Sequence, residues 1–159
     1  LGYYGFNDNV LEITEDGNRG FGFAADLSAD WEKAADLFET ENVADRVVKL
    51  RVSLVLGNEG GVFKDFKALL NQQPNVFEAA NGNSYFPWVH VEDMAAMFAF
   101  GVTKEVIFRG MFALKNQEEK LLNEMNTTFN GQHLSSKKIE KEGFVFKFPK
   151  INEALKNLM

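Results

Sequence analysis

A histidine and two carboxylates stand close together in the middle of the chain: His90 is followed by Glu92 and Asp93. Imidazole and carboxylate groups are common metal ligands. The sequence offers no third ligand at a credible spacing, and the acidic pair opens a predicted helix, where negative charge interacts favourably with the helix dipole. The pattern therefore favours helix capping and packing, and we predict no metal. The neighbouring Trp88 either borders a substrate pocket or lies in the core.

One arginine and a pair of glycines are the other residues that could take part in ligand binding or catalysis. Arg51 lies on the more polar face of a predicted strand over 46–56. A charge within a covered sheet needs a partner, so an ion pair with an acidic residue is favoured over a substrate contact. Gly60 and Gly61 follow the strand, where they either form a plain turn or let the backbone approach a ligand.

Apolar periodicity places these residues on alternating strands and helices. Residues 46–56 alternate as expected for a strand with both faces covered. The predicted helices span 26–41, 62–70, 92–103 and 117–127, then a helix capped by Ser135 and Ser136 and ended by Gly143, and finally 151–158. Further strands are predicted at 111–114 and 144–148, and a short apolar stretch covers 85–91. Strands separated by helices indicate an α/β fold with a partly parallel sheet.

The composition bears on several classes of protein. A net charge of −6 argues against a nucleic-acid partner, which needs clustered Lys and Arg. The chain has no cysteine, which excludes disulfides and thiol catalysis and fits the cytoplasmic location that we predict. Apolar runs are too short to span a bilayer, so we predict no membrane partner. The chain opens at Leu1 rather than Met, which predicts a truncation or residues upstream.

Five strings, in this order along the chain, resemble one family. They are Gly2-Tyr3-Tyr4-Gly5; Asp30-Trp31-Glu32; Arg46 to Gly57 with Gly60-Gly61; Pro87 to Asp93; and Leu134 to Ile139 with Gly143-Phe144, Phe148-Pro149 and Glu153-Ala154-Leu155. Together they resemble the atypical short-chain dehydrogenases/reductases of the NAD-dependent epimerase/dehydratase type. The last string is similar to the small C-terminal domain of unknown function that ends these proteins.

The resemblance implies an α/β fold that comprises the C-terminal half of a Rossmann-like parallel sheet and a small α/β substrate-binding lobe. It divides the chain into the second half of the Rossmann-like domain (1–57), a substrate-side segment that returns to the sheet (58–113) and the small C-terminal domain (114–159). Two features depart from the family. The glycine-rich dinucleotide fingerprint is absent, and the gap from Ala113 to Asn130 is shorter than usual.

Catalytic residues follow from the resemblance only in part. Typical members use a Tyr and a Lys four residues apart as acid/base pair. Alignment on Glu32 puts Ala24 at the Tyr position and Ser28 at the Lys position, so the standard mechanism is not expected. Tyr4 and Tyr3 remain as acid/base candidates, because the resemblance places them at the cofactor crevice. The alternative is that they pack against the following helix and line its rim.

The resemblance implies a predicted NAD(P)-binding, nucleotide-sugar-epimerase-like protein of unknown substrate, and whether it is an enzyme stays open. NADP or NAD would lie near Gly5, Leu56 and Gly57. A small-molecule substrate, with a nucleotide sugar as the implied class, would lie near Gly60, Gly61, Trp88 and His90. A homo-oligomer is left open.

Two other readings remain. The first is a non-catalytic scaffold that keeps the fold and binds the cofactor for a structural or regulatory purpose. The second is a fragment that folds only by pairing its sheet edge with another chain.

Overall fold

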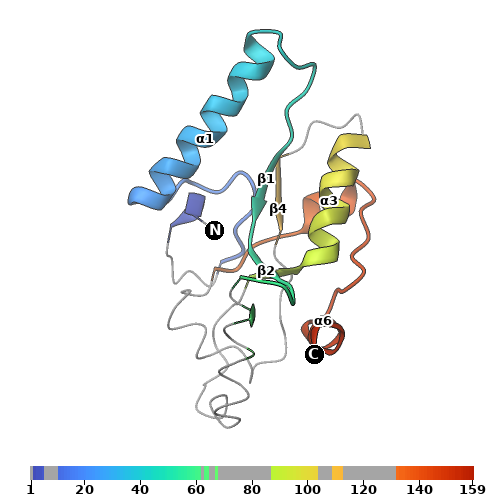
Figure 1. The fold of residues 1–159 in the computed structure, drawn as a ribbon. Helices are drawn as coiled ribbons and strands as arrows, with labels where there is room; N and C mark the ends of the chain where they lie inside the picture. Colours follow the sequence, from blue (N-terminus) through green and yellow to red (C-terminus); the bar gives the residue numbers. More distant parts are fainter. Residues whose placement is uncertain are drawn as a thin grey trace.

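The computed structural model describes residues 2–5, 11–61, 63–64, 67, 87–103, 109–112 and 132–159. The predicted helix at 117–127, most of that at 62–70, and the stretch before Pro87 lie outside these residues. In chain order the elements are η1 (Gly2–Tyr4), α1 (Phe23–Thr40), β1 (Lys49–Val52), β2 (Leu54–Leu56), β3 (Trp88–His90), α3 (Val91–Thr103), β4 (Arg109–Phe112), α5 (Lys137–Lys141) and α6 (Ile151–Leu158). Figure 1 shows helices arranged around short strands.

The strands form two parallel pairs, which confirms the predicted α/β class. β1 pairs with β4, with Lys49 opposite Arg109, and β2 pairs with β3, with Leu54 opposite Trp88. The single strand predicted over 46–56 is divided at Ser53, so its two halves take different partners. Parallel strands need a crossover connection, and α3 lies in the connection between β3 and β4.

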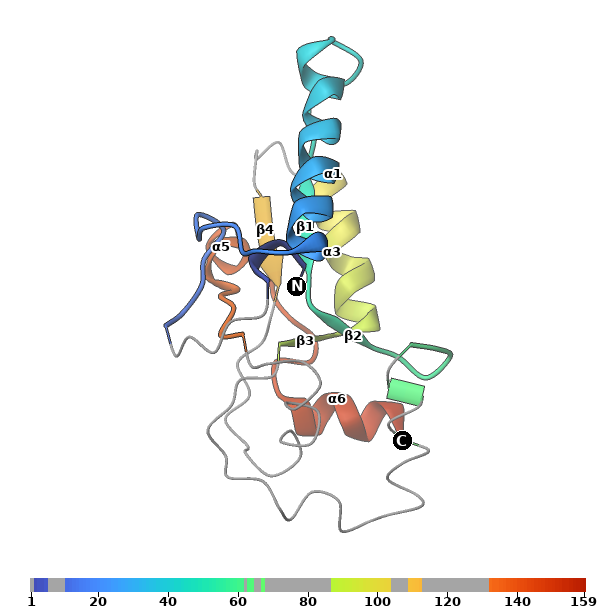
Figure 2. The same cartoon turned by 90° about the vertical axis from the view of Figure 1, so that its left-hand side faces the viewer.

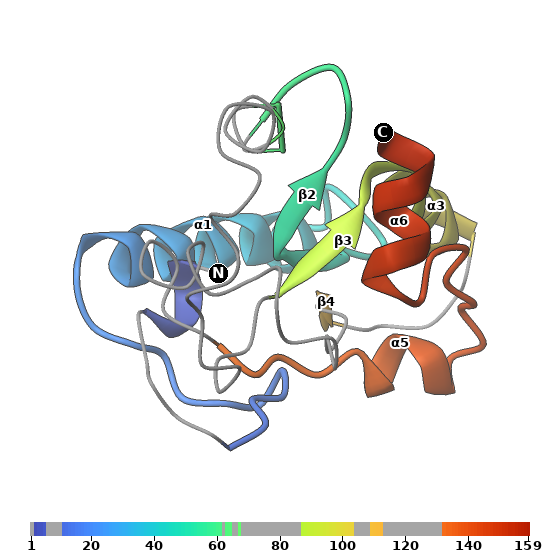
Figure 3. The same ribbon diagram turned by 90° about the horizontal axis from the view of Figure 1, so that it is seen from below.

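Two apolar clusters hold the strands between helices. One joins β2 and β3 to α6, and the other joins β3 to α3 and α5 (Figure 3). Trp88 is fully buried in the first cluster and Val89 in the second. Neighbouring residues of a strand point to opposite faces, so β3 is covered on both sides, as its apolar sequence requires.

The strand predicted over 144–148 is wrong. These residues run without a ladder partner, although Phe144 and Phe148 are buried and Val145 is exposed as alternation requires. The backbone N–H groups of Lys147 and Phe148 donate to the carboxylate of Asp93. A side chain therefore provides the hydrogen bonds that a neighbouring strand would have provided. The predicted end of α5 is confirmed, since Gly143 follows it with a φ of 93°.

The predicted helix α1 is confirmed. Unlike most amphipathic helices, it packs against the protein with its acidic face. Its acidic residues Glu32, Asp36 and Glu39 contact the segment around β1. Its large apolar residues Trp31 and Phe38 are 69% and 53% exposed. Figure 2 shows α1 standing along one side of the strands and extending beyond them.

Candidate functional site

A cavity of about 530 Å³ lies where β2 and β3 end. The loop of residues 57–61, the start of α3 and the end of α6 line it; the polar lining residues are Asn58, Glu59, His90, Glu92 and Asn157. Its volume is within the range of small-molecule sites. In parallel α/β proteins ligands bind beyond the carboxyl ends of the strands, and this cavity has that position.

The loop that borders the cavity depends on glycine at two positions. Gly61 has a φ of 70°, which L side chains rarely adopt. A Cβ on Gly57 would lie 3.3 Å from the Cβ of Val91, so a side chain there would press on the first residue of α3.

His90 is the buried polar group of this cavity. Its Nδ1 accepts a hydrogen bond from the backbone N–H of Glu92 at 3.1 Å, which places the proton of the neutral ring on Nε2. Burial lowers the pKa of His90 below its ordinary value, although Glu92, Asp93 and the Asn157 side chain act in the opposite direction. The Asn157 side chain therefore lies at the ring, but Nε2 makes no hydrogen bond of regular geometry in the described part of the chain. The ring therefore offers a neutral N–H donor beside the cavity.

Asp93 attaches the segment between α5 and α6 to the start of α3. Its two carboxylate oxygens accept the backbone N–H groups of Lys147, at 2.7 Å, and Phe148, at 3.0 Å. The Phe148 ring then lies against His90, with ring centroids 3.9 Å apart. The His90–Asp93 motif, first considered as a metal site, thus joins two parts of the fold. Among the described residues no three His, Asp or Glu side chains lie close enough to hold a metal ion.

Only some of the predicted ligand-binding residues line the cavity. Gly57, Gly60, Gly61 and His90 all line the cavity. Trp88 is buried in the core, on the same face of β3 as His90, and the Leu56 side chain is buried in the same apolar cluster. Gly5 lies beside η1, where its carbonyl accepts a hydrogen bond from the Gln132 side chain.

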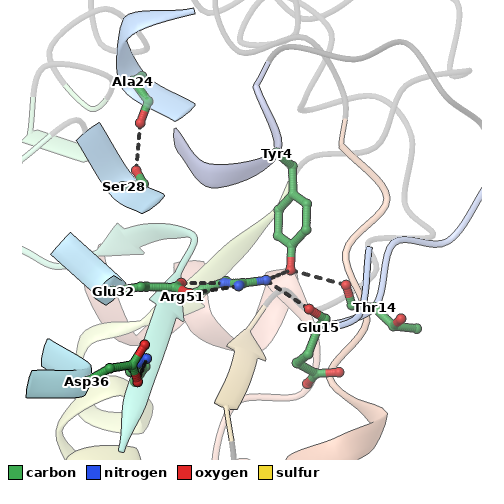
Figure 4. Close-up of polar contacts among 9 residues, drawn as sticks. Tyr4, Thr14, Glu15, Ala24, Ser28, Glu32, Asp36 and Arg51 are labelled. Carbon is green, nitrogen blue, oxygen red and sulfur yellow. Dashed lines mark hydrogen bonds and ion pairs between the residues drawn. The ribbon is translucent and has the colours of Figure 1, made fainter. Parts of the chain in front are cut away.

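A second polar cluster is centred on Arg51 (Figure 4). Its guanidinium donates to both carboxylate oxygens of Glu32 and, on the other edge, to the Tyr4 hydroxyl and the Glu15 carbonyl. The ion-pair partner predicted for Arg51 is therefore Glu32. Burial opposes the charge of Arg51, but these hydrogen bonds outweigh it and raise its pKa.

Both candidate acid/base tyrosines contact this arginine. The Tyr3 ring lies with its centroid 3.5 Å from the Arg51 guanidinium carbon. The Tyr4 hydroxyl accepts from Arg51 and donates to the Thr14 carbonyl at 3.1 Å. Burial raises the pKa of Tyr4 to about 12, although Arg51 acts in the opposite direction. A phenol with this pKa is poorly matched to proton transfer near neutral pH.

Ala24 and Ser28, which the sequence alignment puts at the Tyr and Lys positions of typical short-chain dehydrogenases, make a contact within helix α1. The Ser28 hydroxyl donates to the Ala24 carbonyl one turn earlier, at 2.7 Å. Neither side chain is an acid or a base, and Figure 4 shows Ser28 apart from the Arg51 cluster.

Three residues were not recognised from the sequence as parts of these sites. The sequence marks Glu32 only as part of a motif and as an alignment anchor, and Asp93 only as a candidate metal ligand or helix-capping acid; it gives no indication for Asn157. A sequence signal for Glu32 exists. Glu32 and Asp36 are four residues apart on a helix, and their partners Arg51 and Lys49 are two residues apart on a strand. No local pattern in the sequence predicts that Asn157 lines the cavity.

Comparison with known proteins gives the relatives of this chain. Residues 121–158 match the model of DUF1731, a domain of unknown function. An epimerase family protein of Mycobacterium leprae is 30% identical over 105 residues, which are 66% of this chain and 33% of the relative. One of Staphylococcus aureus is 29% identical over 85 residues, 54% of this chain and 27% of the relative. Over these residues the chain is similar in sequence to epimerase family proteins.

Solved structures show the same fold. A nucleoside-diphosphate sugar epimerase from Corynebacterium glutamicum superposes with a TM-score of 0.75 at 19% identity, over 97% of this chain and 34% of that one. The human epimerase family protein SDR39U1, solved with NADPH, gives 0.77 at 22% identity, over 99% and 62%. The chain spans about a third of the length of the curated epimerase family relatives it matches.

Replacing Asp93 by Asn removes one charge and converts one acceptor into an N–H donor facing a backbone N–H. We expect Asp93→Asn to lower the free energy of unfolding by about 2 kcal/mol and to expose residues 144–150 to limited proteolysis. Urea denaturation and mass spectrometry of the fragments measure both effects. Glu92→Gln is the control, because its ion pair with Lys147 is exposed. Equal effects of the two substitutions would contradict the role given to Asp93.

The lowered pKa of His90 predicts that the protein becomes less stable in mild acid. Its folded-state pKa lies below the unfolded value of 6.5, so the unfolded chain binds the proton first and stability is lost as the pH falls below that value. Urea midpoints at about pH 7.5 and about pH 5.5 should differ less in His90→Asn than in the parent. The chain has one other histidine, His133, and His133→Asn is the matched control.

Removing Glu32 leaves the buried charge of Arg51 without its carboxylate. We expect Glu32→Ala to lower the free energy of unfolding by about 3 kcal/mol, as is typical when one partner of a buried ion pair is lost. Glu41→Ala, at the exposed end of the same helix, should stay within about 0.5 kcal/mol of the parent. A small effect of Glu32→Ala in urea denaturation would contradict the importance of this pair.

Proposed function

We propose that this chain carries the substrate side of an NAD(P)-binding, nucleotide-sugar-epimerase-like protein. The supporting observation is the cavity at the ends of β2 and β3, which brings together the 57–61 loop and the Nε2–H group of His90. A nucleotide sugar is rich in hydroxyl and carbonyl oxygens, and a buried neutral N–H group is a suitable donor to such an oxygen. The backbone of Gly60 and Gly61 allows a close approach.

A nicotinamide dinucleotide, when bound, would supply the hydride acceptor of such a protein. The residues at the cavity fit part of it: the Gly57 backbone borders the space next to a strand end, which is where dinucleotides lie in this fold class. The human relative solved with NADPH supports this choice of cofactor. The 159 residues do not contain the glycine-rich fingerprint for the pyrophosphate, so in this proposal the chain contributes the substrate side and only part of the cofactor site.

The alternative function is a scaffold that binds the cofactor without catalysis. Two observations favour it: Ala24 and Ser28 stand at the acid/base positions, and the Tyr4 hydroxyl is held between Arg51 and Thr14. In this proposal Tyr3 and Tyr4 hold Arg51 in place. If the protein is catalytic, one of these two tyrosines is the proposed acid/base.

Location is a further part of this proposal, and we propose the cytoplasm, with which the lack of cysteine is compatible. No helix in the described residues has the length and apolar character needed to cross a membrane.

Binding and turnover separate these functions. We expect the intact protein to bind NADPH and members of a panel of UDP-sugars in isothermal titration calorimetry. His90→Asn should weaken sugar-nucleotide binding by about tenfold, the value of one lost hydrogen bond of about 1.4 kcal/mol, and leave NADPH binding unchanged. His133→Asn is the matched control. Failure to bind any member of the panel would rule out the proposed substrate class.

Turnover decides between the enzyme and the scaffold. Epimerisation that is lost in a folded Tyr4→Phe variant would identify Tyr4 as the acid/base. Turnover that Tyr4→Phe leaves intact would remove Tyr4 from catalysis. Binding of NADPH without turnover across the panel would establish the scaffold.

A further inference from the structure

The cavity at the ends of β2 and β3 has two polar side chains close together, one buried and one exposed. His90 lines the cavity and is 1% exposed. Asn157, in the last turn of α6, also lines the cavity, and it is exposed. Figure 3 shows α6 beside β3, the strand that ends at His90. Packing of the last helix therefore brings an amide from the end of the chain to the histidine.

The His90 ring is held in one orientation. Its Nδ1 accepts the backbone N–H of Glu92 at 3.1 Å, and the Phe148 ring lies against it with the centroids 3.9 Å apart. Phe148 is itself 8% exposed and belongs to the apolar cluster that includes α6, so it keeps its place. The proton of the neutral ring is therefore on Nε2 and points in a fixed direction.

The Asn157 amide supplies a hydrogen-bond acceptor beside this donor. The Asn157 side chain raises the pKa of His90, which is the effect of an oxygen that accepts a hydrogen bond from the charged ring. The contact is not a regular hydrogen bond, since Nε2 has no partner of normal geometry in the described part of the chain. A donor and an acceptor thus lie near each other without satisfying each other.

A hydroxyl group is the ligand group that completes this pair. It accepts a hydrogen bond from Nε2–H and donates its own proton to the Asn157 oxygen. A carbonyl oxygen or an ionised phosphate oxygen has no proton for Asn157, and an ammonium group has no lone pair for Nε2–H. We propose that His90 and Asn157 together bind one hydroxyl group of the substrate, which makes Asn157 a specificity-determining residue. The inference rests on the proposed function and names the group that the cavity recognises.

The charges around the cavity also favour an uncharged group. The carboxylates of Glu59 and Glu92 line it, and none of the described lining residues is Lys or Arg. Lys147 pairs with Glu92 but is not part of the lining. Helix α3 begins here, and its N-terminus already has Glu92 and Asp93 beside it, so it offers little to a further anion. The sugar of a nucleotide sugar therefore suits this cavity better than its diphosphate.

Access to the histidine depends on movement of Asn157, because Nε2 is buried in this structure. Exposed side chains change rotamer within picoseconds to nanoseconds, and Asn157 is exposed. Phe148 and Leu158, by contrast, are 8% and 3% exposed and are held in the core. Turning the Asn157 amide outward would let a hydroxyl oxygen enter between the amide and the ring. His90 is thus the fixed half of the pair, and Asn157 is the movable half.

Calorimetric titration of the intact protein with substrate analogues tests the hydroxyl preference. The probes are the UDP-sugar of the panel that binds most tightly and its monodeoxyfluoro derivatives, in which fluorine, which cannot donate a hydrogen bond, replaces one hydroxyl at a time. In the parent we expect one derivative to bind about tenfold more weakly, the effect of one lost hydrogen bond. In Asn157→Ala the difference should fall to about twofold or less, because the acceptor is already gone. Asn152→Ala, at an exposed position of the same helix outside the cavity lining, is the matched control and should keep the difference.

Titration of His90 by nuclear magnetic resonance tests the contact without a ligand. Because Asn157 raises the pKa of His90, Asn157→Ala should lower it, and Asn152→Ala should leave it unchanged. Circular dichroism checks that both variants are folded. An unchanged His90 pKa in Asn157→Ala, or a hydroxyl preference that survives this substitution, overturns the inference alone. If no UDP-sugar binds the parent protein, the proposed function fails and the inference fails with it.

Discussion

The carboxylate of Asp93 is the contact on which the arrangement of this fold depends. It lies at the start of α3, directly after β3, and it binds two consecutive backbone N–H groups of the C-terminal lobe. Because β3 ends at His90, the same contact brings Phe148 against the histidine ring and α6 to the edge of the cavity. One buried anion thus connects a strand, two helices and the wall of the candidate site. The hydrogen bonds of two peptide groups offset the cost of burying the charge.

A second buried charge determines the position of α1. Arg51 needs a carboxylate inside the protein, and Glu32 supplies it from the helix. Because this pairing turns the acidic face of α1 inward, the aromatic residues are left outside. Polar pairing, rather than apolar burial, therefore orients this helix. The two tyrosines of the Gly2–Gly5 motif contact the same guanidinium, with the Tyr3 ring on its face and the Tyr4 hydroxyl on its edge.

The resemblance to epimerase family proteins bears on ligand binding, whereas the geometry of this chain bears on catalysis. The fold is shared with a human epimerase family protein that was solved with NADPH. Ala24 and Ser28, which the sequence alignment puts at the acid/base positions of typical short-chain dehydrogenases, form a helix hydrogen bond instead. A protein can keep a ligand site after losing its proton-transfer groups, because binding needs shape and donors whereas catalysis also needs a group with a matched pKa.

The sequence alone determined the α/β class, helices α1, α3 and α6, and the need of Arg51 for an acidic partner, because apolar periodicity, helix-ending glycines and buried charge are local properties. Tertiary structure decided which acid pairs with Arg51 and that residues 144–148 bond to Asp93 instead of a strand. It also placed Trp88 in the core and His90 at the cavity, although they are two residues apart on one strand. Such outcomes depend on contacts between residues 19 to 55 positions apart, and no local pattern records which distant group supplies a hydrogen bond.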